Sequence, residues 1–177
     1  DVTVSATGMS DLTAGEYKIA VEGQKVSVTF TETGLEKLEE DSVVTVNLAA
    51  KVGTGLTVGD IKNKAFTNVN GVDSESNEVE VYYGQIELVK VNQAEQYLAD
   101  AKFELWTDKE GTTGAKMLQG PETTDADGKI LFDSVWTGTT ADACTTYWLK
   151  EVQAPAGYVT PTGDAAWTKV EVCGNST

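Results

Sequence analysis

Apolar side chains alternate with polar ones along most of the chain, which is the pattern of half-buried β-strands. In the first half this alternation predicts strands over residues 16–21, 25–30, 43–48, 61–66 and 78–83. In the second half it predicts strands over residues 85–91, 101–107, 129–133, 147–152 and 167–173. Turn residues recur about every 8–12 positions, which is typical of antiparallel sandwiches of the immunoglobulin type. The pattern therefore predicts an all-β protein.

One segment departs from the period of two. Thr33 and Glu36 have the spacing of a helix capping box and are followed by Lys37, so we expect a single short helix between strands. Near Gly84 one predicted strand ends and the next begins without a linker. We therefore expect two tandem immunoglobulin-like β-sandwich domains, residues 1–84 with the helix and residues 85–177, joined rigidly.

Charge and composition exclude several classes of function. The chain has 13 Lys+Arg against 28 Asp+Glu, a formal net charge of −15, and all its basic residues are lysines. A polyanion such as nucleic acid is therefore not an expected partner. Histidine is absent, which removes imidazole bases and imidazole metal ligands, and there is no Gly-x-Ser-x-Gly motif of a hydrolase. We expect no enzymatic turnover, no cofactor, no metal and no membrane span.

The two cysteines, Cys144 and Cys173, both lie in the last quarter of the chain. A structural metal site needs about four ligands, and the chain has no histidine to supply them. We therefore favour one disulfide bridge, formed in an oxidising exterior, over a metal site.

Two further patterns favour a structural interpretation over a binding site. Residues 125–128 have the first, third and glycine positions of a calcium loop but no bidentate Glu at the required spacing, so a hairpin turn is favoured. The tryptophans could form a carbohydrate platform, but tryptophan on strands more often packs in a core or between domains. They are Trp106, Trp136, Trp148 and Trp167.

A lysine and a glutamate each share a strand face with apolar residues. Side chains at positions i, i+2 and i+4 of a strand point the same way. Lys90 is thus aligned with the apolar residues two and four positions before it, and so is Glu151. Spacing alone favours solvated side chains at both positions, because charged residues are most often exposed.

Three separated motifs in the second half resemble one family. Residues 147–158 read Y-x-L-x-E-x-x-A-P-x-G-Y, which resembles the E-box of collagen-adhesin B-type (Cna-B) domains in sortase-assembled Gram-positive pilins. Residues 85–92 and 98–105 are similar to the opening strand pair of these domains, and residues 124–132 resemble their central Asp-Gly hairpin. The resemblance covers residues 85–172 in the expected order.

The resemblance implies an internal isopeptide bond in the second domain. Lys90 would attack the side-chain amide of an asparagine with loss of ammonia, and Glu151 would assist. An apolar environment favours the neutral amine that a nucleophile needs and a protonated carboxyl that can pass on its proton. Asn175 is the only asparagine after Glu151, whereas the family carries its acceptor on a further strand. The acceptor is thus either Asn175 or a residue beyond the chain end.

The first half is similar to the middle domain of such pilins. The similarity lies in residues 26–38 and 61–65. It implies that Asn63 accepts a second isopeptide bond, from a lysine on a strand that precedes Asp1.

The predicted function is a structural subunit of a covalently polymerised pilus shaft that supports adhesion. Its expected partners are other pilin subunits linked by sortase, with a host surface or other bacteria as further candidates, and its expected location is an extracellular, cell-wall-anchored pilus. The sequence lacks the sortase-linking motif and the sorting signal, so we expect a fragment. Cysteines in the last domain favour an actinobacterial pilin. A tip or accessory adhesin built from the same modules is the alternative.

Overall fold

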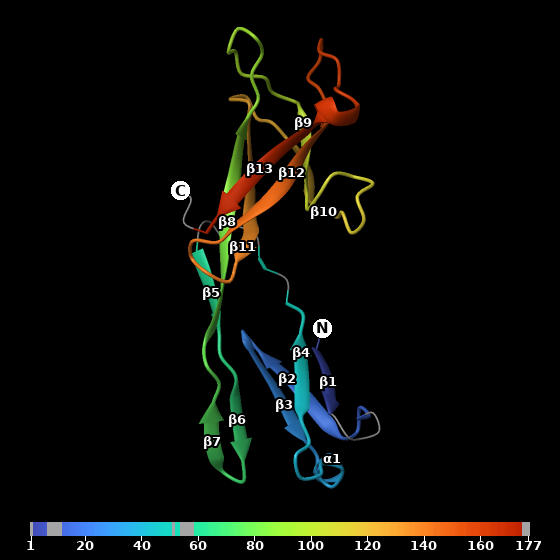
Figure 1. Ribbon diagram of the computed structural model, residues 1–177, viewed down its shortest axis with the longest axis vertical. Helices are drawn as coiled ribbons and strands as arrows, with labels where there is room; N and C mark the ends of the chain where they lie inside the picture. The colour runs from blue at the N-terminus through green and yellow to red at the C-terminus, as the bar shows by residue number, and fades with distance from the viewer. Residues whose placement is uncertain (1, 7–11, 51, 54–58, 175–177) are drawn as a thin grey trace. The chain divides into compact units, whose positions relative to one another are not determined.

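The computed structural model describes residues 2–6, 12–50, 52, 53 and 59–174 (Figure 1). It divides into two compact units, Asp1–Lys51 and Val52–Thr177. Strands dominate both units, so the prediction of an all-β protein is confirmed. Strand β8 (Val79–Val89) continues through Gly84, where the sequence places a domain boundary, and that boundary stays a prediction. Among the described residues, no helix is long and apolar enough to cross a membrane.

The first unit consists of two antiparallel strand pairs and one helical turn. Its elements are β1 (Val2–Ala6), β2 (Tyr17–Glu22), β3 (Lys25–Phe30), α1 (Glu32–Leu35) and β4 (Val44–Leu48). Strand β1 pairs with β4, and β2 pairs with β3 through a tight turn at Gly23, whose φ is 61°. The positive φ explains the glycine at this turn.

Helix α1 begins two residues earlier than the capping box at Thr33 predicts. The cap is Thr31, whose hydroxyl accepts a hydrogen bond from the Gly34 amide at 3.3 Å. A Cβ on Gly34 would lie 2.0 Å from the carbonyl oxygen of Glu16, so only glycine fits there. The prediction of the helix start was wrong because this contact between distant segments sets its position. The buried Glu16 carboxylate also pairs with Lys37, and this hydrogen bond lowers the pKa of Glu16.

The second unit is a sandwich of two antiparallel sheets with an additional hairpin. Its elements are β5 (Gly59–Asn63), β6 (Phe66–Val69), β7 (Val72–Glu75), β8, β9 (Lys102–Trp106), β10 (Met117–Thr123), β11 (Lys129–Gly138), β12 (Cys144–Gln153), η1 (Gly163–Ala166) and β13 (Trp167–Cys173). One sheet has the order β10-β9-β12-β13 and the other β11-β8-β5, while β6 and β7 form the hairpin (Figure 1).

Both sheets contribute to one hydrophobic core. Strand parity selects its members: on β8 the side chain of Ile86 is buried, and on β12 those of Tyr147 and Leu149 are buried. The buried residues of the core are Ile86, Ala101, Phe103, Leu105, Ile130, Phe132, Val135, Tyr147, Leu149 and Val172. Packing of this core fixes the positions of β8, which leads to Lys90, and of β12, which carries Glu151.

Alkaline pH is expected to destabilise the second unit through Tyr147. This side chain is 4% exposed, and its hydroxyl donates a hydrogen bond to the Trp136 carbonyl. Burial, with a smaller contribution from Tyr83, raises the pKa of Tyr147 from 10.0 to about 12. The folded state therefore holds the phenol proton more tightly than the unfolded chain. This contribution is fully present below about pH 10 and is lost as the pH rises toward about 12.

The measurement is urea unfolding of the parent chain and of Tyr147→Phe, followed by tryptophan fluorescence. Between about pH 9 and about pH 12 the difference in unfolding free energy between the two should change by about 2–3 kcal/mol in favour of the variant. A parallel decline of both proteins would contradict this assignment.

Candidate functional site

Lys90 directly follows β8 and is held through its backbone on both sides. Its N–H donates to the Gly128 carbonyl at 2.8 Å, and its carbonyl accepts from the Leu98 N–H at 2.9 Å. Gly128 has a φ of 71°, and a Cβ there would lie 2.5 Å from the Lys90 carbonyl oxygen. Only glycine therefore allows this close approach, which fixes where the Lys90 side chain starts.

Glu151 lies on β12, in the middle of its sheet. It is opposite Phe103 of β9, and its side chain follows Tyr147 and Leu149 on the inward face of the strand. Glu151 is only 8% exposed. The expectation from spacing alone, a solvated glutamate, is therefore wrong, because this face of β12 is covered by the core.

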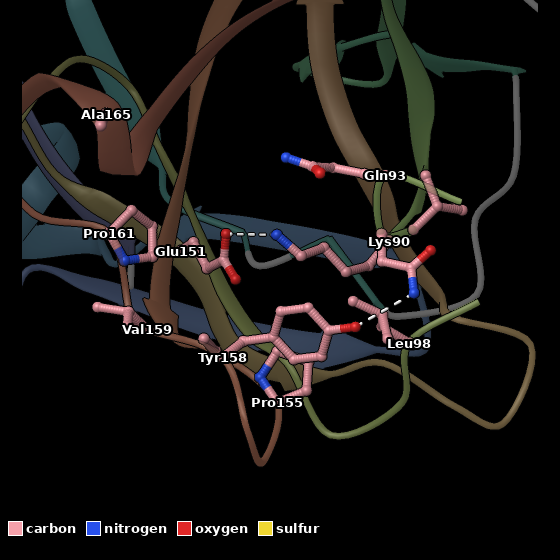
Figure 2. A pocket seen from close by; sticks show the side chains of 12 residues that line it. Lys90, Gln93, Leu98, Glu151, Pro155, Tyr158, Val159, Pro161 and Ala165 are labelled. Atoms are coloured by element: carbon pink, nitrogen blue, oxygen red, sulfur yellow. Dashed lines mark hydrogen bonds and ion pairs between the residues drawn. The ribbon is translucent and has the colours of Figure 1, made fainter. Parts of the chain in front are cut away.

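The two side chains meet inside the sandwich. Lys90 Nζ donates a hydrogen bond to Glu151 Oε2 at 2.8 Å, although the residues are 61 positions apart (Figure 2). The Nζ atom also lies 5.8 Å from the centre of the Phe103 ring, a cation–π distance. The second carboxylate oxygen, Oε1, is buried and has no hydrogen-bond partner within the described part of the chain. One position beside the pair is thus available for a further polar group.

A pocket of about 600 Å³ opens beside the pair. Its lining includes Lys90, Leu98, Glu151, Pro155, Tyr158 and Val159 (Figure 2). Apolar walls around one amine and one carboxylate are the kind of environment in which proton transfer and nucleophilic attack are favoured.

The turn after Glu151 shapes one wall of this pocket. The Tyr158 N–H donates to the Pro155 carbonyl at 3.1 Å, and Gly157 between them has a φ of 88°. The Tyr158 hydroxyl accepts a hydrogen bond from the Asn92 side chain at 3.2 Å. No pattern in the sequence distinguishes Asn92, because an asparagine after a strand is typical of a turn.

Strand β8 has one open edge next to the pocket. It pairs with β5 only over residues 79–83 and with β11 on its other side. Among the described residues, no strand lies against the remaining edge over residues 85–89. An open edge carries unpaired backbone groups and is a template for a further strand.

Of the two asparagines proposed as acceptors, the structure describes one. Asn175 lies outside the described residues. Asn63 ends β5, is exposed, and pairs with Val79 in the strand register. Its neighbour Lys62 bonds to Glu80 at 2.9 Å, and this hydrogen bond raises the pKa of Lys62. The surroundings of Asn63 are therefore a charged surface, unlike those of Lys90.

A disulfide joins Cys144 and Cys173, the pair that the sequence predicts. The two residues are directly opposite each other at the start of β12 and the end of β13. They also belong to the one cluster of potential metal ligands found among the described residues, with Glu171. Because both sulfurs are in the disulfide, neither is a thiolate that could bind a metal.

The acidic segment at residues 125–128 forms a turn, as favoured from the sequence. Asp125 Oδ1 accepts hydrogen bonds from the N–H groups of Asp127 at 2.9 Å and Lys129 at 2.8 Å. These bonds are those of an Asx-turn and occupy the carboxylate.

Three tryptophans pack with lysines on the outer face of the sheet that contains β12. Lys150 Nζ lies 5.7 Å from the Trp106 ring centre and 5.1 Å from that of Trp167. Lys109 Nζ lies 4.8 Å from the ring centre of Trp148. Lysine side chains therefore lie over the rings of Trp106, Trp148 and Trp167 on the outer face of the sheet. None of the four tryptophans belongs to the hydrophobic core, and Trp136 is 44% exposed, so the prediction of core packing was wrong.

The second unit is thus a β-sandwich of two sheets with an ion pair between them. Residues 84–172 match the family described as SpaA: Prealbumin-like fold domain. The chain belongs to this family. A search of curated proteins finds no match.

Solved structures of Gram-positive major pilins resemble the chain. Domains D2 and D3 of the major pilin SpaD from Corynebacterium diphtheriae are 28% identical, with a TM-score of 0.71 over 96% of this chain and 70% of that one. Full-length SpaD is 27% identical, with a TM-score of 0.70 over 96% of this chain and 46% of that one. The Actinomyces fimbrial adhesin FimA is 27% identical, with a TM-score of 0.62 over 97% and 78% of the two chains. Both organisms are actinobacteria, and these matched proteins are pilus components, not enzymes.

Proposed function

We propose that the chain is part of a shaft subunit of a sortase-assembled surface pilus. Family membership and the similarity to major pilins support this function. The chain spans less than half of full-length SpaD, so linkage to other subunits, anchoring to the cell wall and support of adhesion are parts of the proposal. The family match begins at residue 84, which supports a Cna-B-type domain over residues 85–177 after a middle-type domain over residues 1–84.

We further propose that Lys90 forms an internal isopeptide bond with an asparagine. The observation that carries this proposal is the hydrogen bond from Lys90 to the buried Glu151 carboxylate, whose Oε1 atom has no partner among the described residues. In the reaction, neutral Lys90 Nζ attacks the Cγ atom of the asparagine amide. The new C–N bond forms, the bond from Cγ to the amide nitrogen breaks, and that nitrogen leaves as ammonia. Glu151 takes the proton from the attacking amine and delivers it to the leaving nitrogen.

The acceptor amide would reach the site along the open edge of β8. A strand added over residues 85–89 would run beside the residue before Lys90 and could place an amide next to Glu151 Oε1. Asn175 or an asparagine C-terminal to Thr177 is the proposed acceptor. Asn63 stays a predicted acceptor for the first half.

Intact-mass spectrometry of the full-length protein tests the isopeptide bond. After reduction of the disulfide, we expect this bond to lower the mass by one ammonia relative to a variant in which it cannot form, and we expect a cross-linked peptide that contains Lys90. Lys90→Arg and Glu151→Gln should both retain this ammonia, because one removes the nucleophile and the other removes the proton carrier. Lys129→Arg, at an exposed lysine of the same unit, is the matched control and should still lose ammonia. A full sequence mass with Lys90 and Glu151 intact would overturn the proposal.

A further inference from the structure

We propose that the hydrogen bond between Asn92 and Tyr158 is a latch that holds the Lys90–Glu151 pair in its reactive geometry. Asn92 and Tyr158 would then be positioning residues, acting through the pair and not on the acceptor itself. The inference rests on the proposed isopeptide function. It adds a contact between the turn that follows Lys90 and the turn that follows β12, the strand that carries Glu151.

The Asn92 side chain is held by hydrogen bonds within its own turn and makes one further hydrogen bond, to Tyr158. Its Oδ1 accepts from the N–H groups of Ala94 at 2.9 Å and Gln96 at 3.0 Å. Its Nδ2 donates to Gln96 Oε1 at 3.0 Å and to the Tyr158 hydroxyl at 3.2 Å. Three of these four bonds stay within the turn that follows Lys90, so the amide is preset to meet Tyr158.

Tyr158 depends on this bond for the position of its ring. It is 48% exposed, so packing alone encloses only part of the side chain. Tyr158 lies seven residues after Glu151, and its N–H donates to the Pro155 carbonyl within the turn. The bond from Asn92 is the one side-chain hydrogen bond that Tyr158 makes in the described part of the chain. The Tyr158 hydroxyl is therefore hydrogen-bonded to the segment that directly follows β8 and Lys90.

The hydrogen bond between Asn92 and Tyr158 holds the Tyr158 ring as one wall of the pocket that contains Lys90 and Glu151. Tyr158, Asn92, Lys90 and Glu151 all line the same pocket, and Figure 2 shows Tyr158 and Pro155 on one side of the pair. The Lys90 side chain is still 27% exposed, so water reaches part of this site. Attack requires the amine to be held near the acceptor, and loss of a wall would allow movement and admit more water. Opening the latch should therefore slow the reaction.

The experiment measures how fast the newly made protein loses ammonia. The full-length chain is made by a short pulse of cell-free synthesis, and its intact mass is then recorded at successive times. Tyr158→Phe removes only the hydroxyl and should slow the reaction about fivefold, as should Asn92→Ala. The double variant should be no slower than the slower single variant, because both changes remove one bond. Asn92→Asp should recover most of the rate, because its carboxylate can accept a hydrogen bond that the Tyr158 hydroxyl donates. Tyr97→Phe, at an exposed tyrosine of the neighbouring segment, is the control and should react at the parent rate.

The same changes in a Glu151→Ala background separate positioning from folding, because that background cannot react. Equal unfolding free energies with and without Tyr158→Phe support the latch. The latch is overturned if Tyr158→Phe unfolds the protein in that background. It is also overturned if Tyr158→Phe reacts at the parent rate, or if the double variant is slowed by the product of the two single effects. If the parent chain itself loses no ammonia, the proposed function fails and the latch fails with it. A reactive parent with an equally reactive Tyr158→Phe refutes the latch alone.

Discussion

Replacing Phe132 by alanine is expected to lower the unfolding free energy of the second unit by about 3–5 kcal/mol. Phe132 is 0% exposed, lies on β11 opposite Ile86 of β8, and belongs to the core that both sheets share. Its removal loses buried apolar area and leaves a cavity that close-packed neighbours cannot fill. Urea unfolding measures the loss. Tryptophan fluorescence reports on this unit alone, because every tryptophan follows Val52.

Leu131→Ala is the matched control for this prediction. Leu131 precedes Phe132 on the same strand but is 50% exposed, because successive side chains of a strand point to opposite faces. We expect it to change the unfolding free energy by less than about 1 kcal/mol. Equal losses in the two variants would contradict the assignment of the faces of β11, and with it the sandwich core.

Removal of the disulfide is the second change with a large expected effect. The cysteines are separated by 29 positions. Closing a loop of this size lowers the entropy of the unfolded chain, and Cys144→Ser combined with Cys173→Ser should cost about 3–4 kcal/mol of unfolding free energy. Reduction of the parent chain should produce a similar loss in the same urea experiment.

Thiol labelling checks the bond directly. In the unfolded, unreduced parent chain we expect no titratable thiol, and two thiols after reduction. Two thiols before reduction would show that the cysteines are not paired, and no stability could then be attributed to the disulfide.

The alternation of apolar and polar residues was sufficient to predict several of the strands. Strands β2, β3, β12 and β13 lie where the pattern places them, to within about three residues. One face of β12 is buried, whereas β2 is exposed from Lys18 to Glu22, so the alternation predicted the strand even where no face is covered. The boundaries are less well predicted, because hydrogen bonding to a neighbour extends β11 and β12 beyond their alternating segments.

Strand β10 could not be predicted from the pattern. It contains Gly120 and Pro121, residues that are normally evidence against a strand. Because β10 is an edge strand with register shifts against β9, the missing proline N–H costs no internal hydrogen bond. The predicted strand at residues 61–66 is instead divided between β5 and β6. These differences arise from the arrangement of neighbours, which local periodicity does not contain.

The site was only partly predictable for the same reason. Parity aligned Lys90 and Glu151 with apolar side chains, but spacing alone could not show that the two residues meet across 61 positions. The family resemblance, not the periodicity, suggested that pairing. Asn92 had no such signal, because an asparagine after a strand is typical of a turn, and its partner Tyr158 is 66 positions away.

The disulfide also limits how far the chain can lengthen under load. An extended chain spans about 3.3–3.6 Å per residue, so the 29 positions between Cys144 and Cys173 correspond to about 100 Å of contour. While the bond is intact, a pull applied at Gly174 passes from Cys173 to Cys144 through the sulfurs. The force then bypasses residues 145–172, which include Glu151, so this segment cannot be extended.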